Sequence, residues 1–152
     1  MKKTSSLIVV FVCVGTISLL AESMRIDAKT WHGVQTYEVQ TLSKNLKSHT
    51  GELVDVKFNF RGKDIHHTKP NWYEGSIWQP GPSGKKGFSD VRVMIAKKDL
   101  PAFKSITTDA ASSAEIAVYG RVSWDSESNF SFVRLIGRNA IVDPSGNALI
   151  SW

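Results

Sequence analysis

From Val54 to Arg61 the chain alternates strictly between apolar and polar residues, and this pattern constrains the fold more than any other feature. Val54, Val56, Phe58 and Phe60 lie on one side of an extended segment, and polar residues lie on the other. A period of two is the pattern of a strand with one buried face. The segment Leu53–Arg61 is therefore predicted to be a strand of a sheet that the rest of the chain must cover.

Four further segments indicate strands, so we predict a mainly β domain. The predicted strands are Leu53–Arg61, a short one near Gly75–Gln79, Phe88–Ala96, Ile116–Val122 and Phe130–Ile136. Residues 62–87 contain five glycines and three prolines and predict a long connection. Turns are expected at Asp125–Asn129 and Asp143–Asn147, and the last apolar run is Ala148–Trp152.

Two short helices complete the predicted order of elements. Thr41–Lys47 can form one or two helical turns, and Asp99 followed by Pro101 is a typical start of a helix over Leu100–Lys104. Five strands with a helix between the third and fourth are the order of a small OB-fold-like barrel, and a small β-sandwich is the alternative. Gly120, inside a strong strand pattern, predicts a bulge or tight bend.

The first 23 residues predict a secretory signal peptide. Lys2 and Lys3 precede an uncharged, mostly apolar stretch from Leu7 to Leu20, and Ala21 and Ser23 occupy the small-residue positions of a cleavage site. That stretch is short for a membrane span, although an uncleaved anchor is the alternative. Cys13, the only cysteine, lies within it, so the mature chain would contain no disulfide.

These features give a domain plan and a location. Residues 1–23 are the signal peptide, residues 24–41 lack a clean period and predict an irregular N-terminal extension, and residues 42–152 form a single OB-like β domain. We expect a periplasmic or secreted protein with no stable membrane span after cleavage. The sequence does not determine the oligomeric state.

A family resemblance rests on the runs Leu42–Leu46, Thr50–Val56, Val118–Val122 and Phe130–Val133. This skeleton of a short helix, a Gly-x-x-Val-x-Val first strand and a late Val-x-Gly-x-Val strand resembles exported OB-fold proteins of the tRNA-anticodon-binding-like type. The similarity covers about residues 42–137. It implies a fold and an export route and carries no activity with it.

Positive charge and aromatic residues coincide in one part of the chain. Residues 61–98 hold eight basic and three acidic side chains, an excess that is typical either of a solvated face or of an anionic partner. Aromatic rings can stack on a ligand while cations hold its charged groups. The predicted ligand-binding residues are Lys69, Trp72, Tyr73, Trp78, Lys85 and Lys86. The competing interpretation is that the tryptophans plug one end of the barrel.

We therefore predict a binding module without catalysis or cofactor, whose ligand is an extended polymer or protein segment. A glycan, an anionic envelope polymer or a protein is the expected partner, and nucleic acid is less favoured for an exported protein. The alternative is an exported metal-dependent hydrolase that uses His66 and His67. Adjacent residues of an extended segment point to opposite sides, so we predict no metal site there.

The signal peptide generates the first testable prediction. The exported protein should begin at about Met24, because signal peptidase cleaves after small residues such as Ser23. Mass spectrometry of the periplasmic or secreted fraction would measure this N-terminus. An intact 152-residue chain confined to the cytoplasm would contradict the prediction.

Overall fold

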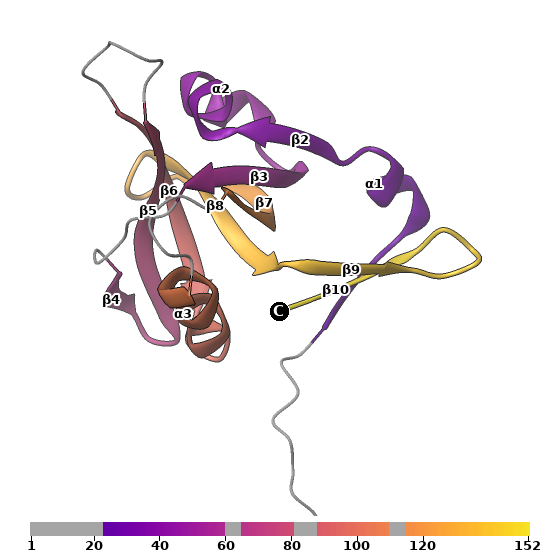
Figure 1. The fold of residues 1–152 in the computed structure, drawn as a ribbon. Coiled ribbons are helices and arrows are strands. Elements are labelled where there is room, and N and C mark those ends of the chain that lie inside the picture. Colours follow the sequence, from indigo (N-terminus) through magenta and orange to yellow (C-terminus); the bar gives the residue numbers. More distant parts are fainter. Residues whose placement is uncertain (1–22, 60–64, 81–87, 110–114) are drawn as a thin grey trace, which may run out of the picture.

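The computed structural model describes residues 23–59, 65–80, 88–109 and 115–152, and it is mainly β, as predicted (Figure 1). Two sheets contain all of its strands. The strands are β1 (Met24–Ile26), β2 (Gln35–Glu38), β3 (Leu53–Asn59), β4 (His66–Lys69), β5 (Trp72–Pro80), β6 (Phe88–Ala96), β7 (Glu115–Asp125), β8 (Phe130–Gly137), β9 (Asn139–Val142) and β10 (Ala148–Ser151). The helices are α1 (Ala28–His32), α2 (Val39–Lys44), the 3-10 helix η1 (Leu46–His49) and α3 (Leu100–Asp109). No described helix is long and apolar enough to cross a membrane.

The larger sheet has the strand order β2-β3-β7-β8-β6-β5-β4. Within it, β6 and β8 run parallel, whereas β3–β7, β7–β8 and β5–β6 are antiparallel. The five predicted strands correspond to β3, β5, β6, β7 and β8, with α3 between the third and the fourth. This is the connectivity expected of an OB-fold-like barrel.

The larger sheet curls back on itself but stays open at one seam. In the described residues β3 meets β5 at a single residue pair, Asn59 with Trp78. The same edge of β3 is occupied earlier by β2, whose parallel pairing runs from Gln35–Val54 to Glu38–Lys57. Because β2 takes this edge, β5 can join β3 only beyond it.

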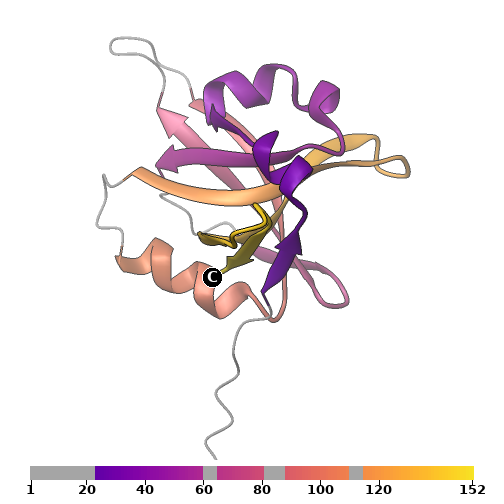
Figure 2. The ribbon, with the colours of Figure 1, turned by 90° about the vertical axis from the view of Figure 1, so that its right-hand side faces the viewer.

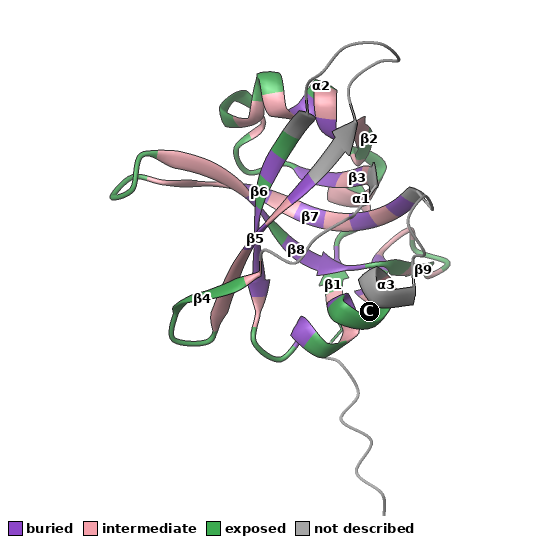
Figure 3. Ribbon diagram, turned by 60° about the vertical axis from the view of Figure 1, so that its left-hand side comes forward, coloured by how far each residue is buried: buried purple, intermediate pink, exposed green. Residues whose placement is uncertain are grey.

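The main core lies inside the curled sheet and is covered at its two ends by α2 and α3 (Figures 1 and 2). The predicted alternation is confirmed, since Val54, Val56, Val91, Val93 and Ile95 are all at most 1% exposed. Figure 3 shows the buried positions recurring along the strands. The helices contribute to the same core: Val39 and Leu42 of α2 and Leu100 and Phe103 of α3 are buried in it.

Residues 24–41 are ordered, in contrast to the irregular extension that the sequence predicted. They form β1, α1, β2 and the start of α2. β1 pairs with β10, and β10 with β9, in a three-stranded antiparallel sheet that has its own small core around Ile26, Ile136 and Ile150. The elements are three to six residues long, too short for a periodic signal, and they are stabilised by distant strands.

Residues 62–87, predicted to be a long connection with one short strand, contain a hairpin instead. β4 and β5 pair around the turn at Pro70 and Asn71, and Asn71 adopts a left-handed backbone conformation (φ 69°) that asparagine tolerates. β5 is nine residues long and also pairs with β6 over its whole length. Gly75, the start of the short strand that the sequence predicted, is buried within β5.

Gly120 marks a bulge, as predicted. The β7–β8 register shifts between Tyr119 and Gly120. A Cβ atom at Gly120 would lie 2.3 Å from Cγ1 of Val133 and 3.0 Å from the carbonyl oxygen of Arg134. The two strands thus approach each other at a point where only glycine fits.

Gly120→Ala should lower the free energy of unfolding by about 1–3 kcal/mol, because the added methyl group overpacks the β7–β8 contact. Gly33→Ala is the matched control: its Cβ would meet its nearest atom, the carbonyl oxygen of Thr30, at an ordinary 3.5 Å. The control should stay within about 0.5 kcal/mol of the parent. Urea denaturation of both variants measures the difference, and equal stabilities would contradict the prediction.

Candidate functional site

Strand alternation places a set of aromatic and cationic side chains on the outer side of β5, β6 and β8. Alternate residues of these strands, such as Ile77, Val93 and Val133, are buried in the core, so the residues between them point outward. We call the resulting surface the aromatic–arginine face. It comprises Trp72 of β5, Arg92 of β6, and Phe130, Phe132 and Arg134 of β8.

Two arginines of this face stack on aromatic rings from other strands of the sheet. Cζ of Arg134 lies 4.9 Å from the ring centroid of Trp72, and Cζ of Arg92 lies 4.2 Å from that of Phe130. The rings of Phe130 and Phe132 pack at 5.7 Å. A stacked guanidinium keeps its N–H edge available for a carboxylate or phosphate, and its orientation is already fixed.

Positive charge on this surface is concentrated near Trp72. Nε of Arg92 lies 2.9 Å from Oε1 of Glu74, which offsets much of that charge. Nζ of Lys69 lies 3.4 Å from Oδ2 of Asp125. Backbone N–H groups of Ser128 and Glu127, and then Lys69, lower the pKa of the Asp125 carboxyl, so this partner stays ionised.

Next to Trp72 the surface is hollowed into an open groove of about 590 Å³. We call it the Trp72 groove. Its lining residues come from the β4–β5 turn, β5, the end of β6, the start of α3 and β8, and they are Asn71, Trp72, Ala96, Lys97, Lys98, Pro101 and Arg134. The lining contains three cationic side chains and no carboxylate. Within the described chain neither Lys97 nor Arg134 forms an ion pair.

Backbone hydrogen bonds fix the walls of the groove. The N–H of Lys97 donates to the carbonyl oxygen of Asn71 at 2.8 Å, which joins the β4–β5 turn to the segment after β6. The N–H of Asp99 donates to Ala96, and the N–H of Phe103 donates to Asp99, where α3 begins. These bonds use main-chain atoms only. They fix the backbone positions of Lys97 and Asn71 and do not involve the side chains of these two residues.

The structure separates the six residues that the sequence predicted as ligand-binding. Trp72 lines the groove, whereas Lys69 lies on β4 in its ion pair with Asp125. The ring of Tyr73 packs against the main core and lies edge-on to His67 at 5.3 Å. Trp78 belongs to β5, but its side chain lies outside the described part of the structure, and so do Lys85 and Lys86.

Sequence analysis missed Arg92, Lys97, Phe130, Phe132 and Arg134 as site residues. The first two belong to the basic run of residues 61–98 but lie beyond the aromatic segment that contains the predicted ligand-binding residues, and the β8 residues are about 60 positions from Trp72. A signal was present in β8, where aromatic and cationic residues occupy the positions opposite in parity to the buried Val133 and Leu135. Only the β6–β8 register, Val93 with Val133 and Met94 with Arg134, connects them to the groove.

The two adjacent histidines lie on β4 and are both exposed. Among the residues that the structure describes, no group of three histidine, cysteine, aspartate or glutamate side chains is placed to hold a metal ion. No observation therefore favours the alternative of a hydrolase using His66 and His67.

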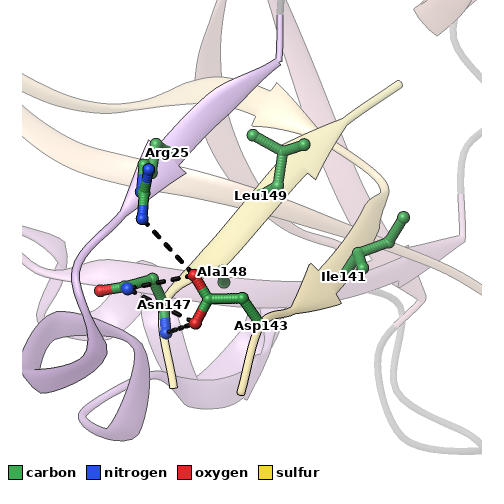
Figure 4. A pocket seen from close by; sticks show the side chains of 6 residues that line it. All are labelled: Arg25, Ile141, Asp143, Asn147, Ala148 and Leu149. Carbon is green, nitrogen blue, oxygen red and sulfur yellow. Dashed lines mark hydrogen bonds and ion pairs between the residues drawn. The ribbon is translucent and has the colours of Figure 1, made fainter. Parts of the chain in front are cut away.

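Two further hollows lie on the surface, and the second of them is also lined by cationic side chains, Lys44 and Lys47. One, of about 240 Å³, lies on the three-stranded sheet, where Arg25 pairs with Asp143 at 3.5 Å and Asp143 accepts hydrogen bonds from Asn147 (Figure 4). The exposed side chains of Ile141 and Leu149 lie beside this pair. The other lies beside α2 and η1, where Nζ of Lys47 is 3.8 Å from the ring centroid of Trp124.

Comparison with known proteins finds no family model, no curated protein and no solved structure that matches this chain.

Adjacent residues of β5 provide a test of whether Trp72 is a surface platform or a core plug. Tyr73→Ala should cost about 2–3 kcal/mol of unfolding free energy, because its ring packs on the core. Trp72→Ala should cost about 1 kcal/mol, mainly its contact with Arg134. Thermal and urea denaturation of the two variants measure the order. A larger loss for Trp72→Ala would mean that this ring is structural.

Proposed function

We propose that this protein is an exported, non-catalytic binding module that holds an extended anionic polymer across the aromatic–arginine face. The observation that carries the proposal is the pair of arginines stacked on Trp72 and Phe130 on one side of the sheet. The stacked geometry supports recognition of a chain that combines rings with negative charges, because one surface offers both complementary groups.

The position of the face supports an extended ligand. Both stacked pairs involve β8, with Phe130 at the start of this strand and Arg134 four residues later, so the two pairs lie one after the other along the direction of β8. A polymer lying along β8 would contact both pairs in turn. Its strongest electrostatic attraction would be at Arg134 and Lys97, since Arg92 is neutralised by Glu74.

Among anionic polymers we favour a glycan or another envelope polymer over nucleic acid. The predicted signal peptide supports a location outside the cytoplasm. A protein partner with an acidic, extended segment would use the same groups and stays the second candidate. The resemblance to exported OB-fold proteins agrees with this proposal but names no ligand.

Three polyanions test the proposal by isothermal titration calorimetry: polygalacturonate, polyglutamate and a 15-residue oligothymidylate. Polygalacturonate should bind, and its affinity should fall as salt rises because the charges are screened and counterions are released. Trp72→Ala should weaken binding by about tenfold at every salt concentration, since it removes a stacking surface. Arg134→Gln should weaken binding and also flatten its salt dependence.

Arg138→Gln is the matched control, because Arg138 is an exposed arginine next to β9, on the three-stranded sheet side of the molecule. This variant changes the net charge as Arg134→Gln does and should bind like the parent. If none of the three polymers binds, the proposed function is wrong. If Arg138→Gln weakens binding as much as Arg134→Gln, attraction is a property of net charge and the face has no specific role.

A further inference from the structure

We propose that the Trp72 groove binds one saccharide ring that carries an anionic substituent, so that the preferred polymer is an acidic glycan. The inference rests on the proposed function and adds the ligand class. It depends on the residues that line the groove and on the contact between the Trp72 ring and Arg134.

The apolar part of the lining favours a sugar over a nucleobase. Arg134 covers the Trp72 ring at 4.9 Å, and the other apolar lining residues are Ala96 and Pro101. A base binds best on freely accessible aromatic faces. Here one indole is combined with a methyl group and a pyrrolidine ring, surfaces that complement the C–H groups of a saccharide and offer no second π face for a base.

The polar part of the lining supplies the charge and polar contacts that an acidic sugar needs. Arg134 and Lys97 approach from β8 and from the segment after β6, and neither has an acidic partner among the described residues. Asn71 adds a side-chain amide that can exchange hydrogen bonds with hydroxyl groups. A guanidinium can form two parallel hydrogen bonds to a carboxylate or phosphate, and that of Arg134 is held over the Trp72 ring.

The groove is preorganised, which separates it from a chance collection of surface lysines. The Lys97–Asn71 backbone hydrogen bond of 2.8 Å ties two of its walls together, and Pro101 lies in the first turn of α3. Its volume of about 590 Å³ falls in the range of small-ligand sites, about 300–1,000 Å³. A ligand would therefore order few groups when it binds.

The experiment uses the exported chain and four small probes: digalacturonate, neutral digalactose, galactose 6-phosphate and a thymidine dinucleotide. Binding is followed by NMR through the backbone amides of Asn71, Lys97 and Arg134 and the indole N–H of Trp72. We expect digalacturonate or galactose 6-phosphate to shift these signals, and the tighter of the two identifies the anion as carboxylate or phosphate. Digalactose should bind at least about fivefold more weakly, because it lacks the charge-assisted hydrogen bonds.

Two variants connect binding to the groove. Lys97→Gln retains the backbone hydrogen bond to Asn71 and should lower the affinity for the acidic sugar by about fivefold. Arg134→Lys keeps the positive charge but loses the planar guanidinium, so this variant should bind the acidic sugar more weakly than the parent does. Arg138→Gln should leave binding of the acidic sugar unchanged.

Each remaining outcome overturns a defined statement. Equal binding of digalactose would show that the groove does not recognise the anionic group. Binding of the dinucleotide alone would assign the groove to nucleic acid. Either result would overturn the inference while the proposed polymer binding stands. Failure of all four probes when polygalacturonate binds would exclude the groove as its subsite. Failure of polygalacturonate and the other polymers as well would remove the proposed function too.

Discussion

Strand β3 is the element on which the rest of the structure depends, because it is paired along both of its edges. β7 follows one edge from Leu53 to Asn59, and the other edge is divided between β2 and β5. Its inward residues Val54 and Val56 are fully buried in the main core. The division of the second edge decides the shape of the domain, since it limits the contact of β5 with β3 to one residue pair and leaves the barrel partly open.

The candidate site depends on the pairing of β5 with β6, because β5 meets β3 at only one described residue pair. β5 pairs with β6 along its entire length, and β6 pairs in parallel with β8 near Val93 and Val133. The outer faces of three strands are thereby joined into one surface. Arg134 can reach Trp72 only because Ala96 stands opposite Trp72 on the intervening strand, where a larger side chain would occupy the space between them.

The sequence predicted the elements that repeat with a regular period and missed those that depend on register. Alternation predicted the strands and the inward residues of β3 and β6, and Gly120 predicted the β7–β8 bulge. β1 and β2 were missed because segments of three or four residues show no period and form only against β10 and β3. Trp72 could be selected because basic and aromatic residues surround it in the sequence. Arg134 could not, because its contact with Trp72 depends on the β5–β6 and β6–β8 pairings, which no local pattern predicts.

The stacked arginines also explain how a small, open site could bind a flexible polymer with useful affinity. An arginine side chain that is free in solution loses much of its rotamer freedom when it binds, and this loss opposes association. Arg134 and Arg92 are already held against aromatic rings, so part of that entropy is lost on folding. The difference between them lies in charge. Arg92 is committed to Glu74 and serves mainly to fix the surface, whereas Arg134, beside Lys97, keeps an uncompensated charge at the groove. Recognition should therefore be polarised: the polymer lies loosely over Phe130 and is held most strongly at Trp72.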